Sequence, residues 1–240
     1  MIILVLVALA VYLNRAYAHI YSTLNKAHLL SPDKNTTYII NRNASANLTY
    51  VALGDSLTAG VGVSQYEESY PYLLAQKIAN QQTQVTLKNL GIPGFKTQDL
   101  INNSLEQAVA SKPDVITLLI GVNDLHGYIS KKDFQKNYQQ ILVTLSKKTT
   151  AKIYVIGLPP IGSNQLLLFP YNYYFRWQTK QFNQTIKDLA TQHNLTYIDL
   201  ETPTAQVSKN TGPYYSIDSF HPSAQGYELW ARIIYASFHR

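Results

Sequence analysis

The sequence predicts a single α/β domain whose parallel sheet is covered by helices on both faces. From residue 50 onward, short apolar segments that stop at glycine or proline alternate with longer segments whose apolar residues recur at helical spacing. Strands that alternate with helices form a parallel sheet with right-handed crossovers. The length of 240 residues favours one or two domains, and a hydrophobic content of 46% is enough for a core.

The predicted strands and helices follow one another along the chain. Strands are expected at residues 50–53, 85–90, 114–120, 153–156 and 195–198. The third and fourth of these are apolar over most of their length, which is typical of strands buried on both faces. Helices are expected at residues 70–79, around 100–109, at 134–145, at about 171–192 and at 227–238. In the third of these helices, Phe134, Tyr138 and Ile141 recur at the i, i+4, i+7 spacing of one helix face.

Residues 1–21 are expected to be a signal peptide or a membrane anchor. The run from Ile2 to Leu13 is apolar without interruption, and an Ala-x-Ala pattern of the kind that signal peptidase cleaves follows at 16–18. At 1.5 Å per residue the run reaches about 18 Å. Continuing the helix through Tyr21 would complete a span of the ~30 Å hydrocarbon core.

The charges beside this run leave its orientation open. No Lys or Arg precedes the run, and Arg15 and Lys26 follow it. We expect export or an outward-facing anchor. The positive-inside rule would instead keep the C-terminal side of a spanning helix in the cytoplasm. A packed N-terminal helix is a third interpretation. Residues 22–47 are expected to be a spacer, because their turn formers show no helical pattern. The main α/β domain is then expected at residues 48–240.

Composition and charge exclude several classes of function. Lys and Arg number 20 and Asp and Glu 14, which gives a formal charge of +6 without any basic block of five residues, so no nucleic-acid partner is expected. A spread positive charge favours anionic surfaces such as lipid headgroups or wall polymers. The absence of cysteine excludes disulfides, thiolate metal sites and a cysteine nucleophile. No metal-binding motif or phosphate-cradling loop occurs, so neither a metal nor a cofactor is expected.

Polar residues follow the ends of the predicted strands, where ligands bind in parallel sheets. Gly54-Asp55-Ser56 ends the first strand, residues 91–94 follow the second, residues 121–124 follow the third, and residues 218–221 precede the last helix. Each group taken alone is typical of a helix cap or a turn. Because all four project from one edge of the sheet, we expect them to converge.

These groups together contain the parts of a serine-nucleophile site. Such a site needs a base, a partner that orients the base, and donors for the oxyanion. Asp218 and His221 can place a carboxylate against Nδ1–H while Nε2 faces Ser56. The backbone N–H groups of Ser56 and Gly94 and the side-chain amide of Asn123 can supply three donors. We therefore predict Ser56, Asp218 and His221 as the catalytic residues.

The order of these groups resembles the SGNH (GDSL) hydrolase superfamily of esterases, lipases and acylhydrolases. The resemblance is carried by Leu53-Gly54-Asp55-Ser56-Leu57, Gly94, Gly121-x-Asn123-Asp124 and Asp218-x-x-His221. It implies a flavodoxin-like three-layer α/β/α fold with strand order 2-1-3-4-5 and an acyl-enzyme mechanism without metal. It also implies Ser56 as nucleophile, His221 as base and then acid, and Asp218 as the orienting residue. The implied oxyanion hole consists of Ser56, Gly94 and Asn123, with Gly91 as the rival of Gly94.

The substrate is expected to meet an apolar and aromatic segment between the fourth strand and the next helix. Leu166 and Phe169 are predicted to line an acyl channel, and Tyr173, Tyr174 and Trp177 could stack on a sugar. The alternative is that these side chains only pack the helix onto the sheet. We predict a serine esterase of acyl lipids or lysophospholipids that associates with the membrane through its N-terminus. An O-acetylesterase of cell-surface polysaccharide is the alternative, and a non-catalytic binding module on the same fold is a further one.

Overall fold

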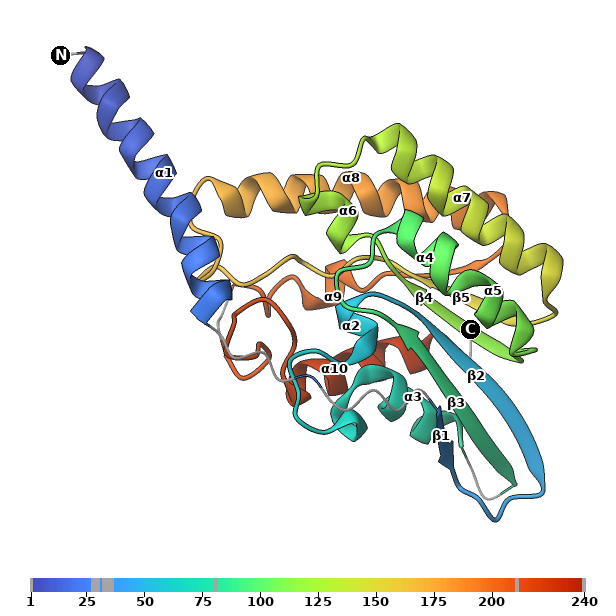
Figure 1. Ribbon diagram of the computed structural model, residues 1–240. Coiled ribbons are helices and arrows are strands. Elements are labelled where there is room, and N and C mark those ends of the chain that lie inside the picture. Colours follow the sequence, from blue (N-terminus) through green and yellow to red (C-terminus); the bar gives the residue numbers. More distant parts are fainter. Residues whose placement is uncertain (1, 27–30, 32–36, 80–81, 210–211, 239–240) are drawn as a thin grey trace.

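The computed structural model describes residues 2–26, 31, 37–79, 82–209 and 212–238 of the chain, and it forms a three-layer α/β/α domain (Figure 1). Within this part, six strands build one sheet in the order β1-β3-β2-β4-β5-β6. The strands are β1 (Thr37–Ile40), β2 (Ala46–Gly54), β3 (Thr83–Gly91), β4 (Val115–Leu119), β5 (Lys152–Ile156) and β6 (Thr196–Ile198). Strands β2 to β6 are parallel, and counted from β2 their order is 2-1-3-4-5. The predicted fold and strand order are confirmed.

Part of the segment expected as a spacer belongs to the sheet. Strand β1 lies within residues 22–47 and pairs antiparallel with β3, and β2 starts at Ala46, ahead of the expected strand. The sequence of β1 is rich in β-branched and aromatic residues, which suit a pleated surface. The ring of Tyr38 in β1 stacks on Tyr66 with centroids 4.1 Å apart. Strand β1 thereby covers the edge that β3 would otherwise leave open.

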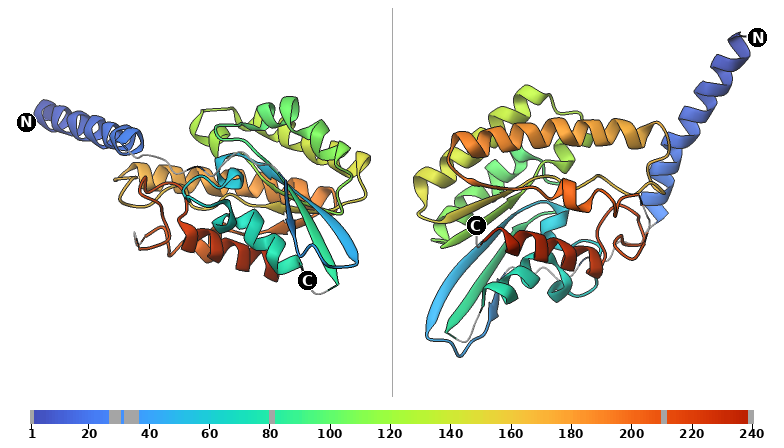
Figure 2. Two further views of the ribbon diagram at one scale, coloured as in Figure 1. Left: turned by 60° about the horizontal axis from the view of Figure 1, so that its bottom comes forward. Right: turned by 180° about the vertical axis from the view of Figure 1, so that it is seen from behind.

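Helices cover both faces of the sheet, as Figures 1 and 2 show. Helices α3 (Tyr70–Ile78) and α10 (Ala224–Ala236) pack together on one face. The other face carries α4 (Thr97–Asn103), α5 (Leu105–Ala110), α7 (Lys131–Lys148) and α8 (Tyr171–Gln192). The helix expected around residues 100–109 is divided into α4 and α5 at Ser104, whose side chain is buried. The remaining predicted helices are present within a few residues of their expected ends.

Four short helical segments lie in the connections between the main elements. They are α2 (Ser56–Ala59), a 3₁₀ turn at Tyr66–Glu68, α6 (Val122–His126) and α9 (Glu201–Thr204). Segments of three to five residues are too short to show a periodic apolar pattern, so the sequence did not predict them. Helices α2 and α6 follow directly on the carboxyl ends of β2 and β4, where they present the candidate site.

The N-terminal helix α1 (Ile2–Lys26) projects from the domain beside the N-terminal end of α8 (Figures 1 and 2). It is long and apolar enough to cross a membrane between Ile2 and Asn25. Its first half is exposed, whereas Ala16 in its second half is buried against the domain. The helix is consistent with a signal sequence or an anchor.

Candidate active site

Ser56 lies at the first position of α2, immediately after the carboxyl end of β2. The side chain of Asp55 caps this helix, because its Oδ1 accepts a hydrogen bond of 3.0 Å from the backbone N–H of Leu57. Gly54 permits close packing at this point, since a Cβ there would come within 2.1 Å of Thr58 Oγ1 in α2 and within 2.2 Å of the carbonyl oxygen of Leu119 in β4. Among the described residues, no hydrogen bond uses the backbone N–H of Ser56. The turn therefore presents the hydroxyl and a free donor together.

The structure brings Ser56, His221 and Asp218 into one hydrogen-bonded chain. His221 Nε2 lies 3.0 Å from Ser56 Oγ, and His221 Nδ1 lies 2.5 Å from Asp218 Oδ2. Because a carboxylate only accepts, Nδ1 carries the proton and Nε2 is left as an acceptor for the hydroxyl. This is the arrangement that nucleophilic attack by a serine requires.

Asp218 is fully buried and is held as a carboxylate. Its Oδ1 accepts hydrogen bonds from the hydroxyl of Ser216 at 2.6 Å and from the backbone N–H groups of Phe220 and His221 at 3.0 and 2.9 Å. Burial by itself would raise its pKa, but the bonds from His221, Ser216 and Phe220 and the His221 charge outweigh it and lower the pKa to about 2. Asp218 thus stays charged at neutral pH. Ser216 was not predicted from the sequence, because an isolated serine carries no pattern.

The two candidate glycines for the oxyanion hole differ in their surroundings. Gly91 packs tightly on α2, where a Cβ would come within 2.5 Å of the backbone nitrogen of Ala59, and its own N–H donates to Asn89 Oδ1 at 2.9 Å. Gly94 has a φ of +83°, and a Cβ there would meet open space. Within the described part of the chain its N–H donates no hydrogen bond. The geometry therefore favours Gly94 as the donor and gives Gly91 a packing role.

Asn123 lies in α6 and faces the turn that carries Gly94. Its Nδ2 donates a hydrogen bond of 2.9 Å to the carbonyl oxygen of Phe95, which fixes the orientation of the amide. An amide nitrogen has two donors, so one remains for a ligand. Asn123, Gly94 and Ser56 thus offer three donors without any added charge, which is what a developing oxyanion needs.

Two further carboxylates are buried behind these residues, Asp55 and Asp124. Burial and, to a smaller extent, the charge of Asp124 raise the pKa of Asp55 to about 7, against the opposing hydrogen bond from the backbone N–H of Leu57. Burial also raises the pKa of Asp124, although two hydrogen bonds from Thr97 act in the opposite direction. Oδ2 of Asp55 has no hydrogen-bond partner in the part of the chain that the structure describes. A buried carboxyl in this state favours its neutral form.

The residues predicted to bind substrate lie in the loop after β5 and in the first turns of α8. Leu166 is buried in the core, whereas the other four are exposed on the surface beside α1. The exposed members are Phe169, Tyr173, Tyr174 and Trp177. None of the five lines the cavity described next.

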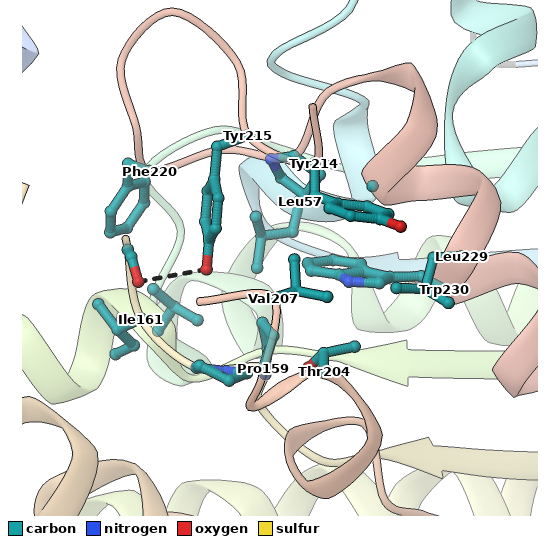
Figure 3. Close-up of a pocket in the computed structure, with 15 residues that line it drawn as sticks. Leu57, Pro159, Ile161, Thr204, Val207, Tyr214, Tyr215, Phe220, Leu229 and Trp230 are labelled. Atoms are coloured by element: carbon teal, nitrogen blue, oxygen red, sulfur yellow. Dashed lines mark hydrogen bonds between the residues drawn. The ribbon is translucent and has the colours of Figure 1, made fainter. Parts of the chain in front are cut away.

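Figure 3 shows a small apolar cavity of about 30 Å³, whose lining does not include Ser56, Asp218 or His221 themselves. Its wall includes Leu57, Val122 and Phe220, the chain neighbours of Ser56, Asn123 and His221. The wall is completed by Ile161 from the loop after β5 and by Tyr215, whose hydroxyl donates to the carbonyl oxygen of Gly162 at 3.2 Å. Sequence reasoning missed this cavity, because its lining comes from segments far apart in the chain.

Comparison with known proteins identifies relatives of this chain. Residues 52–229 match the GDSL-like Lipase/Acylhydrolase family. The spore germination lipase LipC of Bacillus licheniformis is 28% identical over 214 residues, which cover 79% of this chain and 96% of LipC. An acetylxylan esterase of Geobacillus stearothermophilus is 24% identical over 155 residues, which cover 62% of this chain and 69% of that protein.

Solved structures share the fold. The lipase/acylhydrolase from Enterococcus faecalis superposes with a TM-score of 0.64 at 25% identity, covering 80% of this chain and 95% of its own. The acetyl xylan esterase AlAXEase superposes with a TM-score of 0.62 at 22% identity, covering 79% of this chain and 99% of its own, and this likeness concerns the fold. The relatives therefore include both lipases and acetylxylan esterases.

Proposed function

The chain belongs to the GDSL-like lipase/acylhydrolase family and is a carboxylic ester hydrolase, and on this premise we propose that Ser56 is its nucleophile in an acyl-enzyme mechanism. The observation that carries the proposal is the continuous hydrogen bonding from Asp218 through His221 to Ser56. It joins three residues from two distant segments of the chain at the carboxyl edge of the sheet.

In the proposed reaction, the Ser56 hydroxyl attacks the ester carbonyl. His221 Nε2 takes the hydroxyl proton as the bond from Oγ to the carbonyl carbon forms. The oxyanion is stabilised by the N–H groups of Ser56 and Gly94 and by Nδ2 of Asn123. His221 then gives the proton to the departing alcohol, and a water molecule repeats the sequence on the acyl-enzyme to release the acid. Asp218 keeps the imidazole oriented and stabilises its positive charge.

As substrate we propose acyl lipids or lysophospholipids. The support is the exposed apolar surface beside the site, formed by residues such as Phe169 and Trp177, together with the apolar helix α1. The similarity to a lipase agrees with this choice. A lipid ester would bring its acyl chain to an apolar surface, which removes that chain from water.

A second candidate substrate is an O-acetyl group on cell-surface polysaccharide. One specific observation favours it: the cavity lined by Leu57, Val122 and Phe220 measures about 30 Å³, which is close to the space of one or two small groups. The similarity to acetylxylan esterases points the same way. The tyrosine and tryptophan side chains at 173, 174 and 177 would then contact the sugar rings.

Hydrolysis of p-nitrophenyl esters from acetate to palmitate by the detergent-solubilised full chain tests both candidates, with Ser56→Ala alongside. A maximum at eight carbons or longer supports the lipid ester, and activity confined to acetate supports the deacetylase. Activity that survives in Ser56→Ala would contradict the proposed mechanism itself. The full chain is used because β1, ahead of residue 46, belongs to the sheet.

We propose that α1 anchors the domain to the outer face of the membrane. The helix continues through the Ala-x-Ala pattern at 16–18, and Ala16 is buried against the domain, which supports a helix that is retained. Release of the domain by protease added to intact cells is the expected result. A domain found free in the medium whose first residue is His19 would instead report cleavage after Ala18 and would support the signal peptide.

A further inference from the structure

Exposed apolar side chains gather around the candidate active site. Outside α1, the large apolar residues that the structure describes as exposed are nearly all at the carboxyl edge of the sheet. The exception is Ile39 in β1, which lies on the edge strand away from the site. The others are Ile92, Tyr128, Leu168, Phe169, Tyr173, Tyr174, Trp177 and Ile217, which we call the apolar rim.

The connections that carry Gly94, Asn123 and Asp218 all contribute to the rim. The connection that carries Ser56 does not. Ile92 lies in the turn before Gly94, and Tyr128 follows α6, which carries Asn123. Ile217 is 75% exposed and directly precedes Asp218. The remaining members lie in the loop after β5 and in the first two turns of α8. Exposed apolar side chains that gather on neighbouring loops at one edge are typical of a site of contact with a protein or a membrane.

Helix α1 packs against the same rim. The hydroxyl of Tyr12 donates to the carbonyl oxygen of Phe169 at 2.9 Å, and the hydroxyl of Tyr171 donates to the carbonyl oxygen of Leu13 at 3.3 Å. Tyr17 lies against the ring of Tyr171 with centroids 5.9 Å apart, and it also interacts with Tyr128 in the rim. Along the axis of α1, the exposed first half therefore ends beside Phe169, where the helix first contacts the domain.

The charge of these segments suits an anionic surface. Residues 2–26 and 157–179 contain no Asp or Glu, whereas they contain the basic residues Arg15, Lys26 and Arg176. Basic residues close to a membrane are attracted by anionic lipids. Trp and Tyr concentrate where a membrane meets water, and both occur in the rim.

We propose that the apolar rim is a membrane-binding face, which seats the carboxyl edge of the sheet on an anionic lipid surface while α1 is inserted. The exposed first half of α1 is by itself a short anchor. Combined with a second apolar and basic contact, it gives stable attachment in a fixed orientation. In this orientation the candidate site opens toward the lipid. The proposal concerns the placement of the domain, and its test does not depend on esterase activity.

Fluorescence of Trp177 tests the proposal in the full chain. The sequence has two tryptophans, neither in α1, and Trp230 is 7% exposed whereas Trp177 is 57% exposed. The chain is reconstituted in vesicles of phosphatidylcholine and phosphatidylglycerol, and Trp177→Phe provides the signal of Trp230. We expect brominated phosphatidylcholine to quench Trp177 and iodide to reach it poorly. Quenching by iodide without quenching by brominated lipid would overturn the proposal, because α1 would then be only a tether.

A pair of charge substitutions provides the matched control. Tyr173 is 64% exposed in the rim and Ile39 is 40% exposed on the remote edge strand. Tyr173→Asp should reduce the quenching of Trp177 by brominated lipid at least about twofold, because a carboxylate is repelled by anionic lipid. Ile39→Asp should leave the quenching unchanged. Equal quenching in the two variants would contradict a membrane contact through the rim.

Discussion

Thr97 and Asp124 are joined by two hydrogen bonds that connect the two sides of the candidate oxyanion hole. The backbone N–H of Thr97 donates to Asp124 Oδ2 at 2.9 Å, and its hydroxyl donates to Asp124 Oδ1 at 2.5 Å. Both side chains are buried. Thr97 begins α4, three residues after Gly94, and Asp124 follows Asn123 in α6. The pair therefore fixes the distance between the Gly94 turn and the Asn123 amide.

Removing the hydroxyl of Thr97 should slow the reaction more than it weakens substrate binding. Thr97→Val leaves a buried acceptor without its partner and lets the Gly94 turn move, so we expect kcat to fall about tenfold with KM within about twofold. The loss of stability should be roughly 1–3 kcal/mol. Thr97→Ser retains the hydroxyl and should restore most of kcat. If kcat is the same in the valine and serine variants, Thr97 contributes to folding and has no positioning role.

Replacing the hydroxyl of Ser56 should abolish turnover and leave the fold intact. Ser56→Ala is expected to lower kcat by at least about 10³-fold, because the nucleophile is removed. Because Ser56 is only half-buried, the thermal midpoint of the Ser56→Ala variant should stay close to that of the unsubstituted chain. Ser146→Ala, on the exposed face of α7, is the matched control and should keep full activity. Comparable activity in the two variants would contradict the assignment of Ser56.

The alternation of apolar segments was sufficient to predict the parallel sheet, because each crossover helix carries its own periodic stripe, whereas the strand order was implied by the resemblance to the SGNH superfamily. Strand β1 was missed because four residues between turn formers show no repeat, and its pairing with β3 arises only in the folded chain. The separation of α4 from α5 at Ser104 was likewise hidden, since apolar residues on both helices fit one continuous face.

The groups of the candidate site were predictable because three of them follow strand ends, the fourth precedes the last helix, and all four retain their order in the sequence. What the sequence could not predict is how those groups are held. Ser216 supports Asp218 through one hydroxyl, and Thr97 supports Asp124 across a gap of 27 positions. Such contacts join single residues without a pattern, so only the folded arrangement identifies them.

Asp55 should make the stability of the protein fall as the pH rises. Its pKa is raised from 3.8 to about 7 by burial, so the folded chain binds more protons than the unfolded chain between these values. The stabilisation is fully present below about pH 4 and is lost as the pH rises through about 7, with an upper limit of roughly 4 kcal/mol. Thermal unfolding of the unsubstituted chain and of Asp55→Asn from pH 4 to 8.5 measures it. The stability of the unsubstituted chain relative to the variant should fall with rising pH, and a constant difference would contradict a raised pKa.

Ile161 should control the length of the acyl group if the cavity that it lines together with Leu57 and Phe220 receives that group. Ile161→Val removes one methyl group from the cavity wall, so we expect kcat/KM for propionate relative to acetate to rise several-fold, in line with the discrimination that one methylene provides.

Ile153→Val is the matched control for this change, because Ile153 is a buried residue of β5 that does not line the cavity. Both substitutions should cost about 0.5–1.5 kcal/mol of stability. If both variants keep the original preference, the acyl group lies elsewhere, and the exposed surface of Phe169 and Trp177 becomes the place to test next. A shift in Ile161→Val alone would separate the two parts of the substrate, with the acyl group beside Leu57 and the remainder of the ester toward the apolar rim.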